Sequence, residues 1–336
     1  MAGRRNREVF LAERPAGIPE ARHFALRDAP MPEMGDSDIL VRNRFLSVDP
    51  AMRGWVNAAA NYSEPVAIGE TMRSFAASEA AASRHPDCAP GDQVCGLFGW
   101  RDYAAVPGGK VLYRHDFEDI PLSASLGVLG VNGITAYFGL LDLGAPQPGE
   151  IVVVSTAAGS VGSAVGQIAK IKGCRTVGIT GSAAKVRQCQ DEFAYDAAID
   201  YHADGLEGAI AETCPGGANI YFDNTAGAIS DAVYRHLAIG ARCIVCGTAS
   251  QASWDPWPEG PRIERHLLVK RARIQGFILF DYALRFGEAR TQLAAWLAEG
   301  KLNYREDFLD GLEQAPGAIA RLYAGENKGK LLIRLG

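Results

Sequence analysis

The sequence predicts an α/β protein in two parts, an irregular, mostly β domain and a doubly wound, parallel, six-stranded sheet. Three observations support this fold class. The chain has 336 residues, more than the roughly 250 at which a single hydrophobic core stops growing. Short β-like runs, broken by proline and glycine, fill residues 39–109. After residue 122, strand-like and helix-like runs alternate, which is typical of a parallel sheet covered by helices.

The first part is predicted from short apolar runs that are separated by residues unfavourable to regular structure. Residues 39–46 (ILVRNRFL) and 94–98 (VCGLF) contain the β-branched and aromatic residues that favour strands. Prolines and glycines interrupt the chain between these runs, which indicates turns and irregular loops. We therefore expect a mostly β domain with irregular connections.

The second part begins with an apolar helical stretch at 122–143 and a turn at 144–149. Six strand candidates follow, at residues 151–154, 176–179, 197–199, 220–222, 243–245 and 274–278. The helical segments include residues 162–172, 182–193, 228–237 and 282–299. This alternation predicts a parallel sheet with right-handed crossovers.

The composition is typical of a globular chain and excludes several classes of function. Hydrophobic residues make up 48% and charged residues 22%, with a net charge of −5. Lysine and arginine are scattered, so we expect no nucleic-acid partner. No apolar run reaches the ~18 residues of a membrane span or has the form of a signal peptide, so we expect a cytoplasmic protein without a membrane partner. The 7 cysteines are expected to be reduced.

The loop after the first strand of the second part has the features of a dinucleotide-binding turn in a Rossmann fold. It reads Ser155-Thr-Ala-Ala-Gly-Ser-Val-Gly162. Gly159 lets the backbone approach a pyrophosphate, Gly162 lets the helix pack on the strand, and the helix N-terminus offers N–H groups to the phosphates. Ala157 stands where the usual fingerprint has its first glycine, so the string alone also fits a tight turn without a ligand.

The end of the next strand favours NADP(H) over NAD(H). An NAD site usually has an acidic residue there, which accepts hydrogen bonds from the ribose 2′-hydroxyl. Residues 180–185 read Thr-Gly-Ser-Ala-Ala-Lys and contain no acid. Lys185 can pair with a 2′-phosphate, although a lysine in a solvated first helical turn is also common. The predicted cofactor is therefore NADP(H). The absence of an acid is stronger evidence for this choice than the presence of Lys185.

No metal site is predicted. Cys243 and Cys246 have Cys-x-x-Cys spacing, but they lie on an apolar strand that would direct their side chains to opposite faces, so we interpret them as core residues. The 6 histidines are scattered, and none forms an i, i+4 pair. A hydride-transfer enzyme without a metal must stabilise developing oxyanion charge by hydrogen bonds.

Seven short segments together resemble one family. They are residues 46–54 (LSVDPAMRG), 65–70 (PVAIGE), 82–86 (ASRHP), 135–142 (TAYFGLLD), 166–170 (GQIAK), 276–278 (GFI) and 325–330 (GENKGK). From about residue 10 to its C-terminus, the chain resembles the zinc-independent medium-chain dehydrogenase/reductases. Within them it is similar to the group of prostaglandin reductases, alkenal double-bond reductases and curcumin reductases.

The resemblance implies a GroES-like substrate domain at residues 1–125 and a Rossmann NADP-binding domain at 126–305. It also implies that a C-terminal segment at 306–336 returns to the first domain. The implied activity is NADPH-dependent reduction of the C=C bond of α,β-unsaturated ketones and aldehydes, by hydride transfer to the β-carbon. Relatives are commonly dimers joined through their Rossmann domains, and the apolar run 274–280 would suit edge pairing in a homodimer.

The resemblance also assigns cofactor contacts to residues of this chain. The pyrophosphate loop would comprise Ala158, Gly159, Ser160, Val161 and Gly162, and the 2′-phosphate would lie near Gly181, Lys185 and Tyr201. The ribose and nicotinamide would be lined by Asn224, Cys246, Gly247, Thr248, Ser250, Phe277, Ile278, Leu279 and Asn327. Simple core packing would also account for Phe277, and Asn327 could merely hold a turn.

Two departures from the family pattern leave the proton donor open. Many relatives have a tyrosine after Asp-Pro where this chain has Ala51, and a Ser-x-Tyr-Asn string where it has Ser250-Gln-Ala252-Ser. Tyr62 is the nearest remaining candidate for the catalytic proton donor, with solvent as the alternative. The expected pocket for a small hydrophobic carbonyl substrate comprises Ala51, Met52, Tyr62, Trp254 and Phe280. The insert at 254–257 would equally suit an anchor for a partner subunit.

Two other functions stay open at this point. The same scaffold could serve a quinone reductase, or an oxidoreductase of secondary alcohols and carbonyls. The two missing tyrosines also leave room for an NADP-binding protein without turnover.

Overall fold

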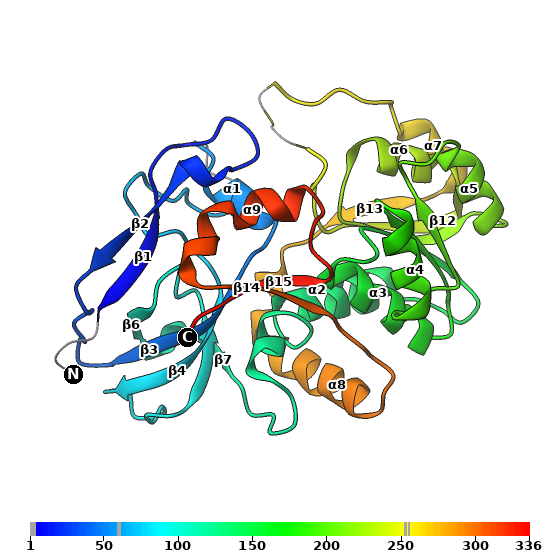
Figure 1. Cartoon of the computed structure of the whole chain (residues 1–336). Coiled ribbons are helices and arrows are strands. Elements are labelled where there is room, and N and C mark those ends of the chain that lie inside the picture. Colours follow the sequence, from blue (N-terminus) through cyan, green and yellow to red (C-terminus); the bar gives the residue numbers. More distant parts are fainter. Residues whose placement is uncertain (1–4, 59–61, 252–253, 255) are drawn as a thin grey trace. The chain divides into compact units, whose positions relative to one another are not determined.

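The computed structural model describes residues 5–58, 62–251, 254 and 256–336. The chain forms two compact units, residues 1–126 together with 306–336, and residues 127–305. The C-terminal segment, coloured red in Figure 1, therefore belongs to the same unit as the blue N-terminal strands. Each unit has a sheet of its own.

The first unit is built on a seven-stranded sheet in the order β14-β15-β3-β4-β5-β7, with β6 also paired to β3. A separate antiparallel pair is formed by β1 (Asn6–Leu11) and β2 (Phe24–Ala29). The seven strands are β3 (Asp38–Ser47), β4 (Ala76–Ser83), β5 (Gln93–Gly96), β6 (Tyr103–Pro107), β7 (Val111–Arg114), β14 (Glu306–Asp310) and β15 (Lys330–Arg334). Its short helices are η1 (Ala21–His23), α1 (Ala51–Trp55), η2 (Gly108–Lys110), η3 (Leu122–Leu126), η6 (Leu312–Gln314) and α9 (Ala315–Tyr323).

The C-terminal segment completes the sheet of the first unit through β15. This strand pairs in parallel with β14 and antiparallel with β3. A buried ion pair connects β15 to the residues that precede α1. Lys330 Nζ lies 2.6 Å from Asp49 Oδ1 and donates a hydrogen bond to the Val48 carbonyl at 3.1 Å. Residues almost three hundred positions apart thus fix the start of α1.

The second unit contains a parallel six-stranded sheet in the order β10-β9-β8-β11-β12-β13, which confirms the predicted doubly wound sheet. Its strands are β8 (Ile151–Ser155), β9 (Arg175–Thr180), β10 (Ala197–Asp200), β11 (Ala218–Asp223), β12 (Leu237–Val245) and β13 (Arg273–Gly276). Val152, Val153 and Val154 in β8 are fully buried. Such a continuous apolar run is typical of a central strand that is covered on both faces.

Helices connect these strands. They are α2 (Val131–Phe138), η4 (Gly139–Gly144), α3 (Ser160–Ile171), α4 (Ala183–Asp191), α5 (Leu206–Thr213), α6 (Gly227–Arg235), α7 (Glu264–Lys270), η5 (Leu279–Arg285) and α8 (Phe286–Ala298). α3 packs against β8 and β9, and α4 packs against β9 and β10. Parallel strands need such crossovers, because a tight turn cannot join them.

The apolar helical stretch predicted over residues 122–143 is helical on both sides of a short turn. The stretch is divided into η3, α2 and the π-helical turn η4, and a hydrogen bond from Gly130 N to Gly127 O closes a turn between η3 and α2. The apolar pattern alone does not reveal the break, because both sides of the turn are buried. The segment predicted as a helix at 282–299 similarly begins as a 3₁₀ helix, η5, and becomes α-helical at Phe286.

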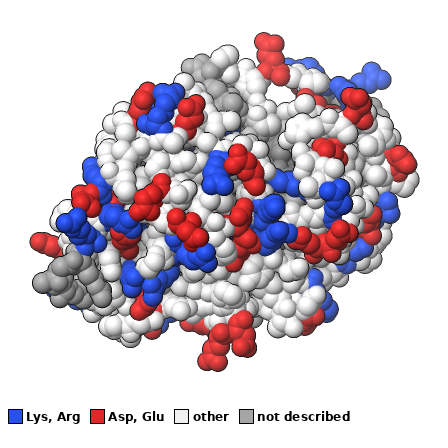
Figure 2. Space-filling view, viewed as in Figure 1, with Lys and Arg blue, Asp and Glu red and all other residues white. Residues whose placement is uncertain are grey.

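Acidic and basic side chains are interspersed on the face drawn in Figure 2. Among the described residues, no helix has both the length and the apolar character that a membrane crossing requires.

Candidate functional site

The carboxyl ends of the parallel strands in the second unit form the candidate cofactor crevice. β8 lies at the centre of the sheet, with β9 on one side and β11 on the other. The chain order reverses between these neighbours, so the loops that follow β8 and β11 leave in opposite directions. Ligands of open α/β sheets bind at such a switch point.

The loop between β8 and α3 requires glycine at Gly162. A Cβ atom added there would lie 2.3 Å from the carbonyl oxygen of Thr156, far inside van der Waals contact. Thr156 itself has a positive φ of 54°, which turns the backbone sharply at the end of β8. The glycine therefore permits the close approach of helix to strand that this type of loop needs.

Ala157 replaces the first glycine of the fingerprint without strain because the neighbouring strand makes room for its methyl group. Ala157 is fully buried. A Cβ atom on Gly178 in β9 would lie only 2.7 Å from the Cβ of Ala157. The absence of a side chain at Gly178 thus compensates for the methyl group of Ala157. The loop therefore keeps its tight turn although the first glycine of the fingerprint is missing.

The N-terminus of α3 fits a pyrophosphate group. Its N-cap residue, Gly159, has no side chain to cap the helix, and the 12 residues of α3 give it a positive dipole end. Gly159, Ser160 and Val161 are half-buried, whereas Ala158 and Gly162 are buried. The cradle is therefore made of backbone, and a phosphate can approach the N–H groups of the first turn without meeting a side chain at Gly159.

The loop after β9 forms the neutral end of the crevice. The phenol of Tyr201 lies over Gly181, where an added Cβ atom would lie 3.1 Å from the Tyr201 Oη atom. Ser182 caps α4 by accepting a hydrogen bond from Lys185 N at 3.3 Å. Burial lowers the pKa of the half-buried Lys185 ammonium, and interaction with Cys189 opposes that shift. Of the three residues predicted near the 2′-phosphate, Gly181 and Tyr201 are thus in contact, and Lys185 lies in the first turn of the helix that follows them.

Asp223, which the sequence analysis did not single out, organises the loop after β11. The residue is 1% exposed at the end of that strand. Its carboxylate accepts hydrogen bonds from the N–H groups of Thr225 and Ala226 (2.9 Å each) and from the hydroxyls of Ser230 (2.6 Å), Tyr221 (3.1 Å), Thr225 (3.3 Å) and Ser155 (3.4 Å). The carboxylate therefore holds residues 224–226 in one conformation.

Asn224 joins the loops after β8 and β11. Its Nδ2 donates to the Ser155 carbonyl at 2.7 Å, and its backbone N donates to Ser155 Oγ at 2.8 Å. The loop after β12 is tied to the same place, because Cys246 N and Gly247 N both donate to the Asp223 carbonyl. Ser250 Oγ also donates to the Thr225 carbonyl at 2.8 Å. In addition to Asn224, the predicted residues Cys246, Gly247, Thr248 and Ser250 thus follow β12 and adjoin the loop after β11.

The run Phe277 to Phe280 follows the edge strand β13. The Phe277 ring packs so closely on Gly139 that an added Cβ atom would lie 2.8 Å from it. Ile278 and Phe280 are 37% and 40% exposed, and Leu279 begins η5. Phe277 is therefore packed on η4, whereas the next apolar side chains reach the surface.

The predicted substrate residues of the first unit differ in exposure. Met52 in α1 is fully buried, Ala51 is half-buried and Tyr62 is 56% exposed. Asn327 donates from Nδ2 to the Gly329 carbonyl at 2.6 Å, so in this structure its side chain holds a turn.

A further hydroxyl, also missed in the sequence, lies beside Ala51. Tyr323 at the end of α9 donates a hydrogen bond from its Oη atom to the Pro50 carbonyl at 2.9 Å. The Arg53 guanidinium lies 4.8 Å from the centre of the Tyr323 ring. Burial raises the pKa of Tyr323 to about 12, Arg53 opposes this shift, and Tyr62 adds to it. No local sequence pattern indicates this hydrogen bond, because its donor and acceptor lie 273 positions apart in the chain.

The segment with the second missing tyrosine is only partly described. Ala252 and the following serine lie outside the described residues. Trp254 is 39% exposed, and its ring lies 5.1 Å from that of Trp257, which is 76% exposed. This aromatic pair is available at the surface of the described part of the chain.

The cysteines and histidines of the described residues form no metal site. Within that part of the chain, no three His, Cys, Asp or Glu side chains gather where they could hold a metal ion. The 7 cysteines are free thiols. Cys243 is buried in β12 and Cys246 is half-buried just beyond it, and burial raises the pKa of both thiols to about 12.

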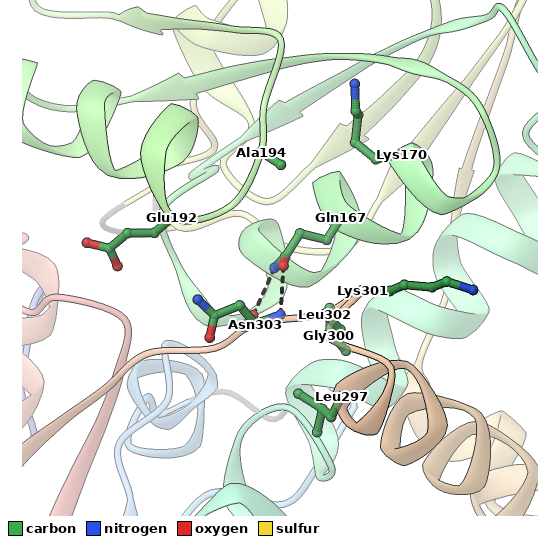
Figure 3. A pocket seen from close by; sticks show the side chains of 9 residues that line it. All are labelled: Gln167, Lys170, Glu192, Ala194, Leu297, Gly300, Lys301, Leu302 and Asn303. Carbon is green, nitrogen blue, oxygen red and sulfur yellow. Dashed lines mark hydrogen bonds between the residues drawn. The ribbon is translucent and has the colours of Figure 1, made fainter.

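A cavity of 460 Å³ lies elsewhere in the second unit (Figure 3). It is lined by Gln167, Lys170, Glu192, Ala194, Leu297, Gly300, Lys301, Leu302 and Asn303. The Gln167 amide exchanges two hydrogen bonds with the Asn303 backbone, and Lys170 is paired with Asp196 at 2.7 Å. Gln167 lies about two turns from the N-terminus of α3. We therefore do not assign the cofactor to this cavity.

Comparisons with known proteins agree with this geometry. Residues 7–113 match a family described as the N-terminal domain of oxidoreductase, and residues 160–299 match one described as zinc-binding dehydrogenase. The NADPH-dependent curcumin reductase of Escherichia coli is 42% identical, covering 98% of this chain and 97% of that protein. The NADP(+)-dependent 2-alkenal reductase of Nicotiana tabacum is 34% identical over the same shares of the two chains.

A solved structure gives the same result. CurA from Vibrio vulnificus in complex with NADPH superposes with a TM-score of 0.92 at 41% identity, covering 98% of this chain and 99% of that chain. The match extends over both units. The chain therefore belongs to the zinc-independent medium-chain dehydrogenase/reductases, in the group that includes curcumin, alkenal and prostaglandin reductases.

Proposed function

We propose that this protein is an NADPH-dependent reductase of the C=C bond of α,β-unsaturated ketones and aldehydes. The observation that carries the proposal is the pair of loops at the carboxyl ends of β8 and β9, at the switch point of the sheet. It combines a backbone cradle at α3 with a loop at Gly181 that contains no acid and with Lys185 in the first turn of α4. The relatives support the substrate class, since they are named as NADPH- or NADP(+)-dependent reductases of curcumin and of 2-alkenals.

The residues of the crevice bind and orient the cofactor. When bound, NADPH supplies a hydride for the β-carbon of the substrate. The N–H groups at the start of α3 hold the pyrophosphate, and Lys185 and Tyr201 hold the 2′-phosphate. The loops tied to Asp223 and Asn224 line the ribose and nicotinamide, together with the run after β13 and Asn327.

The remaining chemistry is a proton transfer to the α-carbon and stabilisation of the enolate oxygen. We assign the proton to Tyr62, with solvent as the alternative source, and the oxygen to nearby N–H or hydroxyl groups. The expected pocket comprises Ala51, Met52, Tyr62, Trp254 and Phe280. It would hold a small hydrophobic carbonyl compound and exclude water from the reacting atoms.

The activity test follows NADPH absorbance with a panel of enones, enals, quinones and simple aldehydes, each also measured with NADH. The expected result is turnover of enones and enals with NADPH, giving products whose carbonyl is intact. Reduction of quinones alone, or conversion of carbonyls to alcohols, would replace this proposal with another reaction on the same scaffold. Tight NADPH binding without turnover of any compound would identify a non-catalytic binding protein.

The proposal extends to domain roles, assembly and location. Residues 1–125 with 306–336 would form the substrate domain, and residues 126–305 the NADP-binding domain. The protein would be cytoplasmic and a homodimer. The homodimer is supported by the edge strand β13, whose residues are mostly exposed, and by exposed Leu268 and Val269 in α7. Sedimentation equilibrium would test the dimer, and a monomer at micromolar concentration would contradict it.

A further inference from the structure

The residue after Tyr201 lies at the same end of the crevice and has no role so far. β10 pairs in parallel with β9, so the chain after Asp200 emerges beside the chain after Thr180. Tyr201 N donates to the Thr180 carbonyl at 2.9 Å, which fixes this alignment. The rings of Tyr201 and His202 are 4.2 Å apart, and His202 Nδ1 lies 3.0 Å from the Gly181 carbonyl oxygen.

The contact with Gly181 defines which imidazole nitrogen can titrate. A carbonyl oxygen only accepts hydrogen bonds, so Nδ1 must carry a proton and donate it. Nε2 is then the nitrogen that gains a proton when the ring becomes charged. The His202 side chain is 66% exposed, so solvent can deliver that proton.

The charged and titratable groups that the structure places beside His202 are those of Asp200 and Tyr201. Asp200, at the end of β10, lies 3.9 Å from Nδ1 and accepts a hydrogen bond from the His202 backbone N at 3.0 Å. Tyr201 contributes a phenol, whose ring lies 4.2 Å from the imidazole. Lys185 follows Gly181 in the chain and lies in the first turn of α4. The acid at this end therefore faces the imidazole, and residues 181–185 on the cofactor side stay free of acids.

We propose that His202 is a pH-dependent contact for the 2′-phosphate of NADP(H), which strengthens the preference for NADPH over NADH as the pH falls. The inference rests on the proposed function only in that NADP(H) is the cofactor. A 2′-phosphate carries a charge of about −1.5 to −2 near neutral pH. Lys185 offers one cation, and the protonated imidazole beside Gly181 offers a second.

The test measures the binding of adenosine 2′,5′-bisphosphate and adenosine 5′-monophosphate by calorimetry at about pH 6 and about pH 8. The ratio of the two affinities isolates the 2′-phosphate and needs neither hydride transfer nor a substrate. The phosphate groups of the bisphosphate themselves gain protons near pH 6, and this affects its binding to every variant. Variants are therefore compared with the wild type at the same pH. His202→Gln removes the titrating group, His202→Lys makes the charge permanent, and His85→Gln in the first unit is the control.

At about pH 6 we expect the wild type to bind the bisphosphate five- to tenfold more tightly than His202→Gln, the order of one charge-assisted contact. At about pH 8 the two should agree within about twofold, while His202→Lys stays tight at both pH values. The monophosphate should bind all variants alike. Identical pH dependence in wild type and His202→Gln would overturn the inference and leave NADP binding intact. Failure of the wild type to prefer the bisphosphate at either pH would overturn the cofactor assignment as well.

Discussion

Each unit has a buried carboxylate near its part of the proposed site, and the two are compensated differently. Asp223 in the second unit is surrounded by neutral N–H and O–H donors, all from residues near the carboxyl ends of β8 and β11. Asp49 in the first unit is paired with Lys330, a charged residue 281 positions away. The cofactor crevice is thus held by hydrogen bonds between adjacent loops, whereas the start of α1 depends on an ion pair with the C-terminal segment.

This difference predicts the largest stability effect for Lys330→Ala. The substitution leaves the Asp49 carboxylate buried without its lysine, which costs about 4 kcal/mol in the free energy of unfolding. Urea denaturation measures it. Arg334→Ala on the same strand is the matched control, since Arg334 and Asp310 form an exposed pair that is worth less than about 1 kcal/mol. Equal losses in the two variants would show that the buried pair contributes no more than a surface pair.

Asp223→Ala should have the next largest effect, a loss of about 3 kcal/mol in the free energy of unfolding. The substitution leaves several buried N–H and O–H donors without an acceptor, but it leaves no opposite charge unpaired. NADPH affinity should fall as well, since the N–H groups of Thr225 and Ala226 lose their common acceptor. Asp231→Ala in α6 is the control for removing a carboxyl group. Burial raises the pKa of Asp231, and its removal should cost less than about 1 kcal/mol. An Asp223→Ala variant with normal stability and NADPH binding would contradict the proposed tethering of the loops.

The sequence predicted the parallel sheet of the second unit well because its signals are local. The six strands were recognisable as short apolar runs, and each lies in the sheet of the second unit. Gly162 was recognisable from its place between a strand and a helix. Asp223 could also have been found, since it directly follows a predicted strand and precedes a predicted cofactor residue.

The start of α1 was less predictable because its contacts join distant residues. Nothing near Ala51 in the sequence indicates that Tyr323 reaches the Pro50 carbonyl or that Lys330 pairs with Asp49. The break within residues 122–143 was hidden for another reason, since apolar periodicity does not register a buried turn at Gly127–Gly130. Sequence patterns thus located the backbone cradle but not the side chains contributed by the returning C-terminal segment.

The two tyrosines near α1 allow the proton donor to be tested. Tyr62→Phe should lower kcat about a hundredfold, a typical contribution of a general acid. Tyr323→Phe loses the hydrogen bond to the Pro50 carbonyl, so it should cost about 1 kcal/mol of stability with turnover largely retained. Single-turnover rates with saturating NADPH measure the effect. Loss of turnover only in Tyr323→Phe would transfer the role to that residue, and full turnover in both variants would assign the proton to solvent.

The smallest expected effect concerns the cofactor crevice again, at the neutral end that contains Gly181. Lys185→Glu replaces the half-buried ammonium by a carboxylate, which repels a 2′-phosphate and can accept from a ribose 2′-hydroxyl. NADPH affinity should fall about tenfold or more relative to NADH affinity, the equivalent of one charge-assisted contact. Fluorescence titration with the two reduced cofactors measures this ratio directly. Lys172→Glu, at the exposed C-cap of α3, makes the same change in net charge and should leave the ratio unaltered. If both variants lower NADPH affinity equally, the selectivity arises from the overall charge of the unit and not from a contact at Lys185, and the neutral loop after β9 would then carry the preference alone.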